Sequence, residues 1–327
     1  MKAILTHAPG GREQLYLGEL PSPSMFKHEL VIKVRASGVN RADILQRQGK
    51  YPPPEGVSPI IGLEVSGHVQ GLGEGCKRFK KGDRVMALLA GGGYAEYVSV
   101  NENLVMPVPK NVDLTDAAGI PEAFITAYQI LFEIAKVKTQ EWVLIHAGAS
   151  GVGTAAIQLC KAVGAKCIAT VRSNEKVEFC TSLGAEVAIN TDATKFDRQV
   201  LEITDGKGAD VVLDPVGAAY YEMNMAIAAL DCRWVVIAGL GGVKIHEFNL
   251  AKLLVKRVAL TGSTLRSRDR NYKSRLVKGF SDQLLSRFGT GELQPIIDEV
   301  FDVHKVATAH EYMESNSNKG KLILRWP

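Results

Sequence analysis

The sequence predicts an α/β protein in which a β-rich domain accompanies a doubly wound parallel sheet. Residues 1 to about 122 read as short strands separated by turns, whereas strands alternate with helical stretches from about residue 123. A glycine turn in the middle of the chain joins an apolar strand to a helix, as in proteins that bind dinucleotides. We therefore expect one domain over 123–264 and a second that combines 1–122 with 265–327.

The β-rich part is marked by short apolar runs and by turn signals. The turn signals are Lys81-Gly82-Asp83 and Gly91-Gly92-Gly93. The expected strands are Met1–Thr6, Leu30–Val34, Arg84–Leu89 and Tyr94–Val100, and Lys321–Leu324 is expected to rejoin this domain as a strand.

The second part begins with an expected helix, Ala123–Ala135, which leads into a strand at 142. Helical stretches separate several of the later strands, and this alternation favours a parallel sheet. These later strands are expected at 166–171, 187–190, 210–214, 233–239 and 257–262.

The turn after the first of these strands has the composition of a dinucleotide site. Val143–Ala147 is a nearly unbroken apolar run, which suits a strand covered on both faces. Glycines then let backbone amides approach a pyrophosphate, and the helix that follows presents free N–H groups and a partial positive charge. A serine replaces the middle glycine of the usual pattern, so a hydroxyl points towards the phosphates or the nicotinamide. The candidate residues are Gly148, Ser150, Gly151, Val152 and Gly153.

The end of the second strand indicates which dinucleotide is bound. NAD-binding proteins usually carry an acid there, on the ribose hydroxyls. This chain instead has Arg172, Ser173 and Lys176, which can bind a 2′-phosphate by charge-assisted hydrogen bonds. The sequence therefore predicts NADPH as the cofactor, and hence a reductase. The alternative is an ordinary glycine turn with solvated basic residues behind it.

Composition and charge exclude several other classes of protein. The chain has 327 residues, of which 46% are hydrophobic and 23% charged, and its net charge is only +4. The basic clusters, Lys80-Lys81 and Arg266–Arg275, are interpreted as solvated surface, so nucleic acid is not a favoured partner. No apolar run approaches transmembrane length. The five cysteines lack a C-x-x-C pattern and fit reduced thiols in a cytoplasmic protein.

A β-rich domain, a dinucleotide fold in mid-chain and a return segment follow one another in the order of the medium-chain dehydrogenase/reductase superfamily. The chain resembles the zinc-free quinone oxidoreductase branch of that superfamily over essentially its whole length. The resemblance implies a GroES-like catalytic domain and a Rossmann domain that binds NADPH. The stretches that carry it are Asn40–Asp43, Arg47–Pro52, Gly62-Leu63-Glu64, Lys81–Val85, Tyr94–Tyr97, Ile120–Ala123 and Asn318–Lys321.

Against the zinc alcohol dehydrogenases of the same superfamily, the metal ligands are missing. By this resemblance, Asn40 stands where their first catalytic cysteine would be, and Leu63 replaces the histidine before Glu64. Glu122 falls at about the position of the third ligand. Catalytic zinc usually has three protein ligands, so we expect no metal. The loop with four cysteines for structural zinc is also absent.

The same resemblance assigns further residues to the nicotinamide and ribose. The branch often has a tyrosine after the asparagine that ends the third strand, near the 2′-phosphoribose. Here Thr191 follows Asn190, and Arg172 is an added cation that can compensate. The remaining assigned residues are Thr126, Gly239, Leu240, Thr264, Leu265 and Asn318.

Three side chains are candidates for the reaction itself. Tyr51 can donate a hydrogen bond or a proton to the acceptor oxygen, or it can simply pack among the prolines that follow it. Asn40 can orient the acceptor or stabilise a turn, and Ser150 can meet the nicotinamide or cap the loop. Asp43 is expected to hold the cleft rather than move protons. His146 and His68 are interpreted as satisfied core histidines.

The sequence therefore predicts NADPH-dependent reduction of a quinone, by hydride or by single electrons. A quinone becomes aromatic on reduction, so positioning and a proton suffice and no metal is needed. Reduction of an alkenal or enone is the alternative within the same class, and a non-catalytic NADPH- or RNA-binding protein is the alternative outside it. A homodimer is expected by analogy, through the strand at 257–262.

Overall fold

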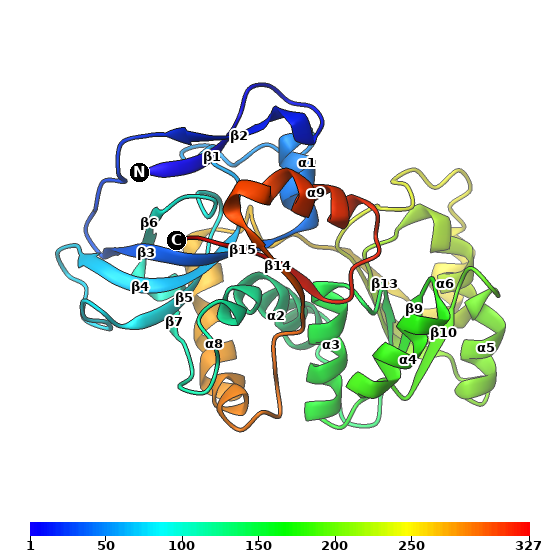
Figure 1. The fold of residues 1–327 in the computed structure, drawn as a ribbon. Coiled ribbons are helices and arrows are strands. Elements are labelled where there is room, and N and C mark those ends of the chain that lie inside the picture. Colours follow the sequence, from blue (N-terminus) through cyan, green and yellow to red (C-terminus); the bar gives the residue numbers. More distant parts are fainter. The chain divides into compact units, whose positions relative to one another are not determined.

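The computed structural model describes all 327 residues and divides into two compact units. Unit 1 is Met1–Ile125 with Leu265–Pro327, and unit 2 is Thr126–Thr264. Figure 1 shows strands predominating in the blue, cyan and red segments of unit 1 and alternating with helices in the green segment of unit 2. The predicted fold class, a GroES-like β domain with a parallel Rossmann sheet, is confirmed.

Unit 1 is built on a seven-stranded sheet and a two-stranded sheet. The order in the larger sheet is β14-β15-β3-β4-β5-β7, and β6 pairs with β3. The strands of this unit are β1 (Lys2–Thr6), β2 (Leu15–Glu19), β3 (Glu29–Val39), β4 (Glu64–Leu72), β5 (Arg84–Leu88), β6 (Tyr97–Asn101), β7 (Val105–Pro107), β14 (Ile297–Asp302) and β15 (Lys321–Arg325).

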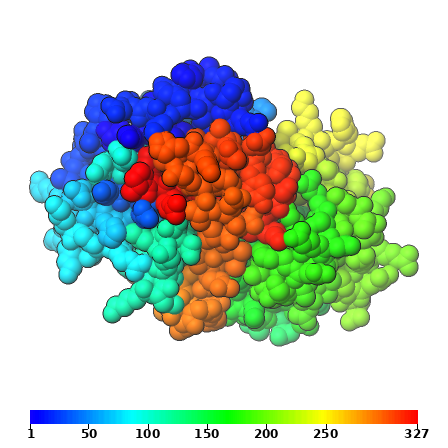
Figure 2. Space-filling view, viewed as in Figure 1, coloured from blue at the N-terminus to red at the C-terminus, as the bar shows by residue number.

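The carboxyl-terminal strand β15 is part of the amino-terminal sheet, as the sequence predicts. It runs antiparallel to β3, and Leu322 pairs with Val39. Figure 2 shows the red atoms of the last residues beside blue and cyan atoms of the first part of the chain. This pairing brings Lys321 next to Asn40, although 281 residues separate them in the sequence.

Two helices of unit 1, α1 and α8, begin at residues whose side chains or neighbours bond the first backbone amides. Asn40 precedes α1, and its own N–H donates to Asp43 Oδ2 in the first turn at 2.7 Å. Asp269 precedes α8, and its side chain accepts from the N–H of Tyr272 at 2.8 Å. The helices are α1 (Arg41–Arg47), α8 (Arg270–Gly289), α9 (Val306–Glu314) and the short 3-10 turns η1 (Arg12–Gln14), η2 (Glu102–Leu104), η3 (Asp116–Gly119) and η6 (Val303–Lys305).

Unit 2 is a six-stranded, fully parallel sheet. Its strand order is β10-β9-β8-β11-β12-β13. Successive strands are added on one side of β8 up to β10 and on its other side from β11 onward, as in dinucleotide-binding folds. Ligands of such sheets bind outside the carboxyl ends of the strands at this reversal. The strands are β8 (Trp142–His146), β9 (Lys166–Val171), β10 (Val187–Asn190), β11 (Ala209–Asp214), β12 (Ala228–Val236) and β13 (Ala259–Gly262).

Helices connect these parallel strands. The boundary between the units falls within α2, which continues as the π-helical segment η4. The helices are α2 (Pro121–Tyr128), η4 (Gln129–Ile134), α3 (Gly151–Ala162), α4 (Asn174–Leu183), α5 (Phe196–Ile203), η5 (Ala218–Tyr220), α6 (Tyr221–Ile227) and α7 (Leu250–Lys256).

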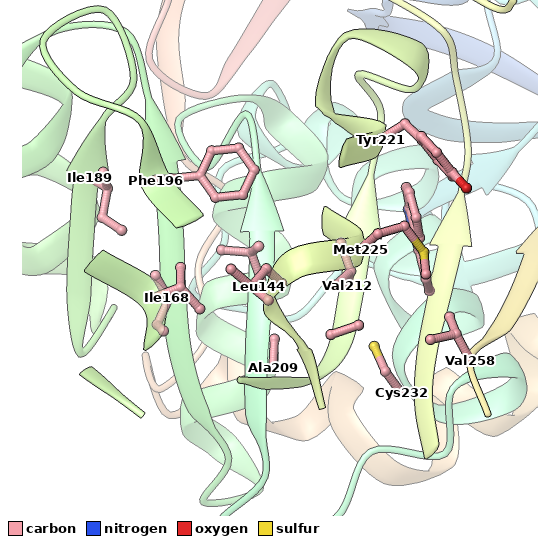
Figure 3. Packing of buried hydrophobic residues seen from close by; sticks show 14 residues of the cluster. Leu144, Ile168, Ile189, Phe196, Ala209, Val212, Tyr221, Met225, Cys232 and Val258 are labelled. Atoms are coloured by element: carbon pink, nitrogen blue, oxygen red, sulfur yellow. The ribbon is translucent and has the colours of Figure 1, made fainter. Parts of the chain in front are cut away.

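The core of unit 2 includes side chains of the parallel sheet and of the helices that cover it. Figure 3 shows Leu144 and Ile168, from neighbouring strands, next to the ring of Phe196 from α5. Each of these side chains is fully buried. Truncating a buried Phe to Ala typically costs about 3–5 kcal/mol, so this cluster contributes strongly to the stability of the unit.

Several expected strands have different bounds in the structure: the strand expected at Leu30–Val34 extends over Glu29–Val39, and the one expected at 257–262 begins at Ala259. The strand expected at 233–239 begins at Ala228 and ends at Val236, because the amides of Leu240 and Gly241 bond to Pro215 and Val216 instead of continuing the ladder. The strand expected at Tyr94–Val100 begins only at Tyr97. The amide of Tyr94 donates to Ile61 of a loop, and this draws the residue away from β3.

Candidate active site

In unit 2, the turn between β8 and α3 leaves backbone donors free. Ser150 caps α3, and its Oγ accepts from the N–H of Gly153 at 3.1 Å. The amides of Gly151 and Val152 donate to no protein group. A Cβ on Gly153 would lie 2.4 Å from the carbonyl oxygen of Ala147, so only glycine permits this close turn. Two free amides at the start of a helix fit a diphosphate.

The carboxyl end of β9 carries a cation with no protein partner. Arg172 follows the strand directly, is exposed, and makes no hydrogen bond or ion pair with the protein. Ser173 next to it caps α4 by accepting from the N–H of Lys176 at 3.3 Å. The structure thus brings these three predicted residues together at one helix start. Their arrangement fits a phosphate on the ribose.

Thr191 lies across from this site at the end of β10. Its Oγ1 donates to Val171 O at 3.1 Å and accepts from the hydroxyl of Tyr220 at 3.2 Å. A tyrosine from η5 therefore lies beside the position where the sequence lacks one. Nothing in the sequence near Thr191 pointed to Tyr220, because it comes from a different strand connection.

In unit 1, a buried ammonium is held by three oxygens. Nζ of Lys321 lies 2.5 Å from Oε1 of Glu64, 2.7 Å from Oδ1 of Asn40 and 3.0 Å from the carbonyl oxygen of Val39. The amide Nδ2 of Asn40 also donates to Glu64 Oε1 at 2.9 Å. Burial without these partners would cost several kcal/mol, so the cluster is a paired and hydrogen-bonded unit.

Adjacent strands and a close backbone approach build this cluster. Asn40 follows the end of β3, Glu64 starts β4 and Lys321 starts β15. A Cβ on Gly38 would lie 2.2 Å from Oε1 of Glu64, so the missing side chain makes room for the carboxylate. The other oxygen of Glu64, Oε2, accepts from the backbone N–H of Glu122 at 2.8 Å.

The donor set does not fit zinc. The carboxamide of Asn40 and the carboxylate of Glu64 are both bound to the Lys321 ammonium, and Leu63 is a buried apolar residue. No group of three or more His, Cys, Asp or Glu side chains is placed to hold a metal ion. Catalytic zinc needs three protein ligands, usually nitrogen or sulfur, and a positive charge already lies between two of the candidate groups.

Comparison with known proteins agrees with both units. Residues 27–110 match the alcohol dehydrogenase GroES-like domain family, and residues 151–280 match the zinc-binding dehydrogenase family. The quinone oxidoreductase of Lama guanicoe is 30% identical over 99% of this chain and 97% of its own length. The chain belongs to the quinone oxidoreductase-like branch of the medium-chain dehydrogenase/reductase superfamily.

Solved structures of this superfamily share the complete fold. Escherichia coli quinone oxidoreductase complexed with NADPH superposes with a TM-score of 0.90 at 28% identity, over 100% of both chains. The CurK enoyl reductase superposes with a TM-score of 0.88 at 27% identity, over 100% of this chain and 99% of its own.

The oxidoreductase also contains a buried hydrogen-bond chain that the sequence did not reveal. Oδ2 of Asp43 accepts from the Tyr94 hydroxyl at 3.1 Å, and that hydroxyl lies 3.2 Å from Nε2 of His310. Nη1 of Arg47 lies 3.4 Å from Nδ1 of His310, and Arg47 is paired with Glu314 at 2.7 Å. Burial lowers the pKa of His310 to about 3, so the ring is neutral. Arg47 therefore donates to Nδ1, and Nε2 carries the proton.

Asp43 is the least satisfied member of this chain. It is fully buried, and its Oδ1 has no hydrogen-bond partner. Burial raises its pKa to about 7 against the bonds from Asn40 and Tyr94, which lower it. Asp43 thus links the start of α1 to Tyr94, and its expected role in holding the cleft stays a prediction.

Tyr51 is held by an arginine that the sequence had placed on the surface. Arg266 is only 3% exposed, and its guanidinium carbon lies 5.2 Å from the centre of the Tyr51 ring. It donates to Ala90 O at 2.7 Å, to Gln46 Oε1 at 2.7 Å and to Tyr51 O at 3.2 Å. The prediction that Arg266–Arg275 is solvated surface is therefore wrong for Arg266. It is also wrong for Lys273, which is buried and donates to Arg266 O at 3.1 Å.

The two histidines differ. His146 is buried, with Nδ1 2.8 Å from Thr170 Oγ1 and Nε2 2.8 Å from Asn224 Oδ1, as expected for a core histidine. His68 is exposed, so the same interpretation was wrong for it. It lies on β4 at a position where the alternation of the strand turns the side chain to solvent.

The remaining predicted residues lie on loops and helix ends of their own units. In unit 2, Thr126 lies in α2, Gly239 and Leu240 follow β12, and the carbonyl of Thr264 accepts from Gln129 at 3.4 Å. In unit 1, Leu265 is buried, and Asn318 donates to Gly320 O at 2.8 Å in the turn before β15. None of the helices combines the length and apolar character needed to cross a membrane.

Proposed function

We propose that this oxidoreductase reduces quinones with NADPH and without zinc. The observation that carries the proposal is the Lys321 ammonium, bound by Asn40 and Glu64 where the metal-dependent members are expected to hold their ion. A quinone gains aromaticity when reduced and needs no Lewis acid. Quinone oxidoreductases among the relatives support this substrate class.

NADPH, when bound, supplies the hydride. Unit 2 is proposed to hold it through the free amides of Gly151 and Val152 and through Arg172. The donor Oγ–H of Ser150 remains available, since only its acceptor side is used in capping α3. The structurally similar Escherichia coli quinone oxidoreductase is complexed with NADPH, which agrees with a phosphate-binding cation at Arg172.

Unit 1 is proposed to bind the acceptor. The Tyr51 hydroxyl makes no hydrogen bond within the protein, so it is free to donate to an acceptor oxygen, and Arg266 holds its loop. Asn40 uses its carboxamide on Lys321 and Glu64. We therefore propose Asn40 as a positioning residue and Tyr51 as the direct contact.

A turnover screen tests the proposed function. NADPH oxidation is measured with a panel of quinones and a panel of alkenals and enones, at matched concentrations. Turnover of quinones is expected, and NADPH oxidation by alkenals alone would contradict it. The likeness to an enoyl reductase favours reduction of a carbon–carbon double bond as the second candidate. RNA affinity with a steep salt dependence and no turnover at all would favour a non-catalytic binding protein.

Within its branch, we propose the tumour-suppressor-inducible quinone oxidoreductases of animals as the nearest group, on the motifs around Tyr51 and Glu122.

A homodimer through β13 is supported by the position of that strand at the edge of its sheet and by three exposed apolar side chains of α7. These are Leu250, Leu254 and Val255. Light scattering should give twice the mass of the chain. Five unpaired cysteines are consistent with the cytoplasm.

A further inference from the structure

Glu122 carries a carboxyl group that the protein leaves unpartnered. It lies in the first turn of α2, and its side chain is partly exposed. Its backbone N–H is fixed to Glu64 Oε2 at 2.8 Å, yet its carboxyl oxygens make no hydrogen bond or ion pair. The residue is thus firmly placed, while its acidic group is left for something other than the protein.

The neighbouring carboxylate, Glu64, has the partners that Glu122 lacks. Glu64 receives three donors: the Lys321 ammonium at 2.5 Å, the Asn40 amide at 2.9 Å and the Glu122 N–H at 2.8 Å. Both oxygens of Glu64 are thus occupied by donors. The carboxyl group of Glu122 receives no donor from the protein. Glu122 is therefore the carboxyl of this cluster that is left for another group.

The other charged groups around Glu122 do not neutralise it. Asp43, on α1, adds a second negative neighbour, whereas the charge of Lys321 is already paired with Glu64. Lys273, on α8, points its ammonium at the carbonyl of Arg266, at 3.1 Å. Burial, followed by the charge of Glu64, raises the pKa of Glu122 to about 8. Glu122 therefore keeps its proton to a higher pH than an ordinary glutamate does.

A second unpartnered polar group belongs to the same surroundings. The Tyr51 hydroxyl has no hydrogen-bond partner, and the charge of Glu122 is felt at Tyr51 strongly enough to raise the pKa of the phenol, after burial. Arg266 contacts the Tyr51 ring and keeps this loop in place. We propose that Glu122 is the proton donor to the acceptor and that Tyr51 hydrogen-bonds the same acceptor. This inference rests on the proposed reductase function.

Besides the acceptor and Glu122, the reaction needs only one further reactant, the reduced nicotinamide dinucleotide. The acceptor gains a hydride, and with it two electrons, from the dinucleotide, which is oxidised. The O–H bond of Glu122 breaks, and a new O–H bond forms on the reduced oxygen of the acceptor. The carboxylate that remains takes a proton back from water, because the side chain is partly exposed.

Replacement of the acid by its amide tests the proposal. Glu122→Gln keeps the size and the backbone bond to Glu64 but cannot release a proton. Its kcat for a quinone at pH 7 should fall by about 10²-fold, at the lower end of general-acid effects, with the NADPH dissociation constant unchanged. Glu122→Asp, which retains an acid, should recover part of kcat. Glu133→Gln removes an exposed carboxylate further along the same helical segment and should behave as the native protein.

The pH profile gives a measurement that does not depend on a variant. Because the protonated form is the active one, kcat of the native protein should decline as the pH rises through about 8, and a solvent isotope effect should accompany it. The decline should disappear in Glu122→Gln. A native profile that is flat between pH 6 and 9, or an unchanged kcat in Glu122→Gln, overturns the role of Glu122. Absence of turnover in the native protein with every acceptor would instead overturn the proposed function.

Discussion

The ammonium of Lys321 lies 2.5 Å from Oε1 of Glu64, and the two side chains are 4% and 0% exposed. The pair joins the last strand of the chain to the start of β4. It also supplies a fixed positive charge in a superfamily whose best-known members use a metal ion.

Removal of one side chain of the Lys321–Glu64 pair should lower the free energy of unfolding. Lys321→Met leaves Glu64 buried without its cation, and breaking such a pair costs about 3–5 kcal/mol. Urea denaturation of the native protein, of Lys321→Met, of Glu64→Gln and of the double variant completes a thermodynamic cycle. The double variant should be more stable than the sum of the single effects predicts. Strict additivity would show that the pair is not coupled.

Arg172 should select NADPH over NADH. Its side chain is exposed and makes no hydrogen bond or ion pair with the protein, so its replacement should change binding and leave the fold intact. Arg172→Asp should raise the NADPH dissociation constant by about 10- to 100-fold, because each lost charge-assisted hydrogen bond is worth about 1.5–3 kcal/mol. NADH affinity should change little. Arg198→Asp, at an exposed arginine of α5, is the matched control. Equal losses for both dinucleotides would remove Arg172 from 2′-phosphate recognition.

Arg266 should be needed for the order of the Tyr51 loop. Lysine cannot reproduce the three bonds to Ala90, Gln46 and Tyr51, since these use the planar fork of a guanidinium. Arg266→Lys should lower the free energy of unfolding by about 1–3 kcal/mol and raise KM for the quinone. NADPH affinity should be retained. Arg270→Lys, at an exposed position of the same segment, should alter neither quantity, and a normal KM in Arg266→Lys would refute the role.

Asp43 should make the protein less stable as the pH rises. Its folded pKa of about 7 lies above the ordinary 3.8, so the folded state binds more protons than the unfolded state between these values. The stabilisation is complete below about pH 4 and is lost as the pH rises through 7. Asp43→Asn should flatten the dependence of unfolding free energy on pH in this window. An unchanged slope would show that Asp43 ionises normally.

The fold could be predicted because the apolar residues of the two units follow different periods. The apolar run Val143–Ala147 and the glycines after it define β8 and the start of α3. The end of β12 could not be predicted, since apolar residues continue beyond Val236 while the backbone turns away to bond Pro215 and Val216. The periodicity of apolar residues indicates which side chains are buried, but it does not indicate the partners of the backbone hydrogen bonds.

The site could be predicted only where one local stretch builds it. Arg172, Ser173 and Lys176 are neighbours in sequence and in space. The hydrogen-bond chain of Asp43, Tyr94 and His310 joins three segments that are distant in the sequence. No local sequence pattern predicts it. The burial of Lys321 could not be predicted either, because a lysine at the start of the apolar strand Leu322-Ile323-Leu324 can equally point to solvent. Arg266 was misread because a basic cluster in a sequence does not show which cations are buried.

Zinc dependence of quinone reduction distinguishes a site organised by Lys321 from a site organised by a metal ion. The protein is dialysed against a strong chelator, its zinc content is measured, and NADPH-dependent quinone reduction is compared before and after. Full activity is expected at negligible zinc, because Lys321 supplies the fixed charge beside Asn40 and Glu64. Loss of activity on chelation, with recovery on addition of zinc, would contradict it.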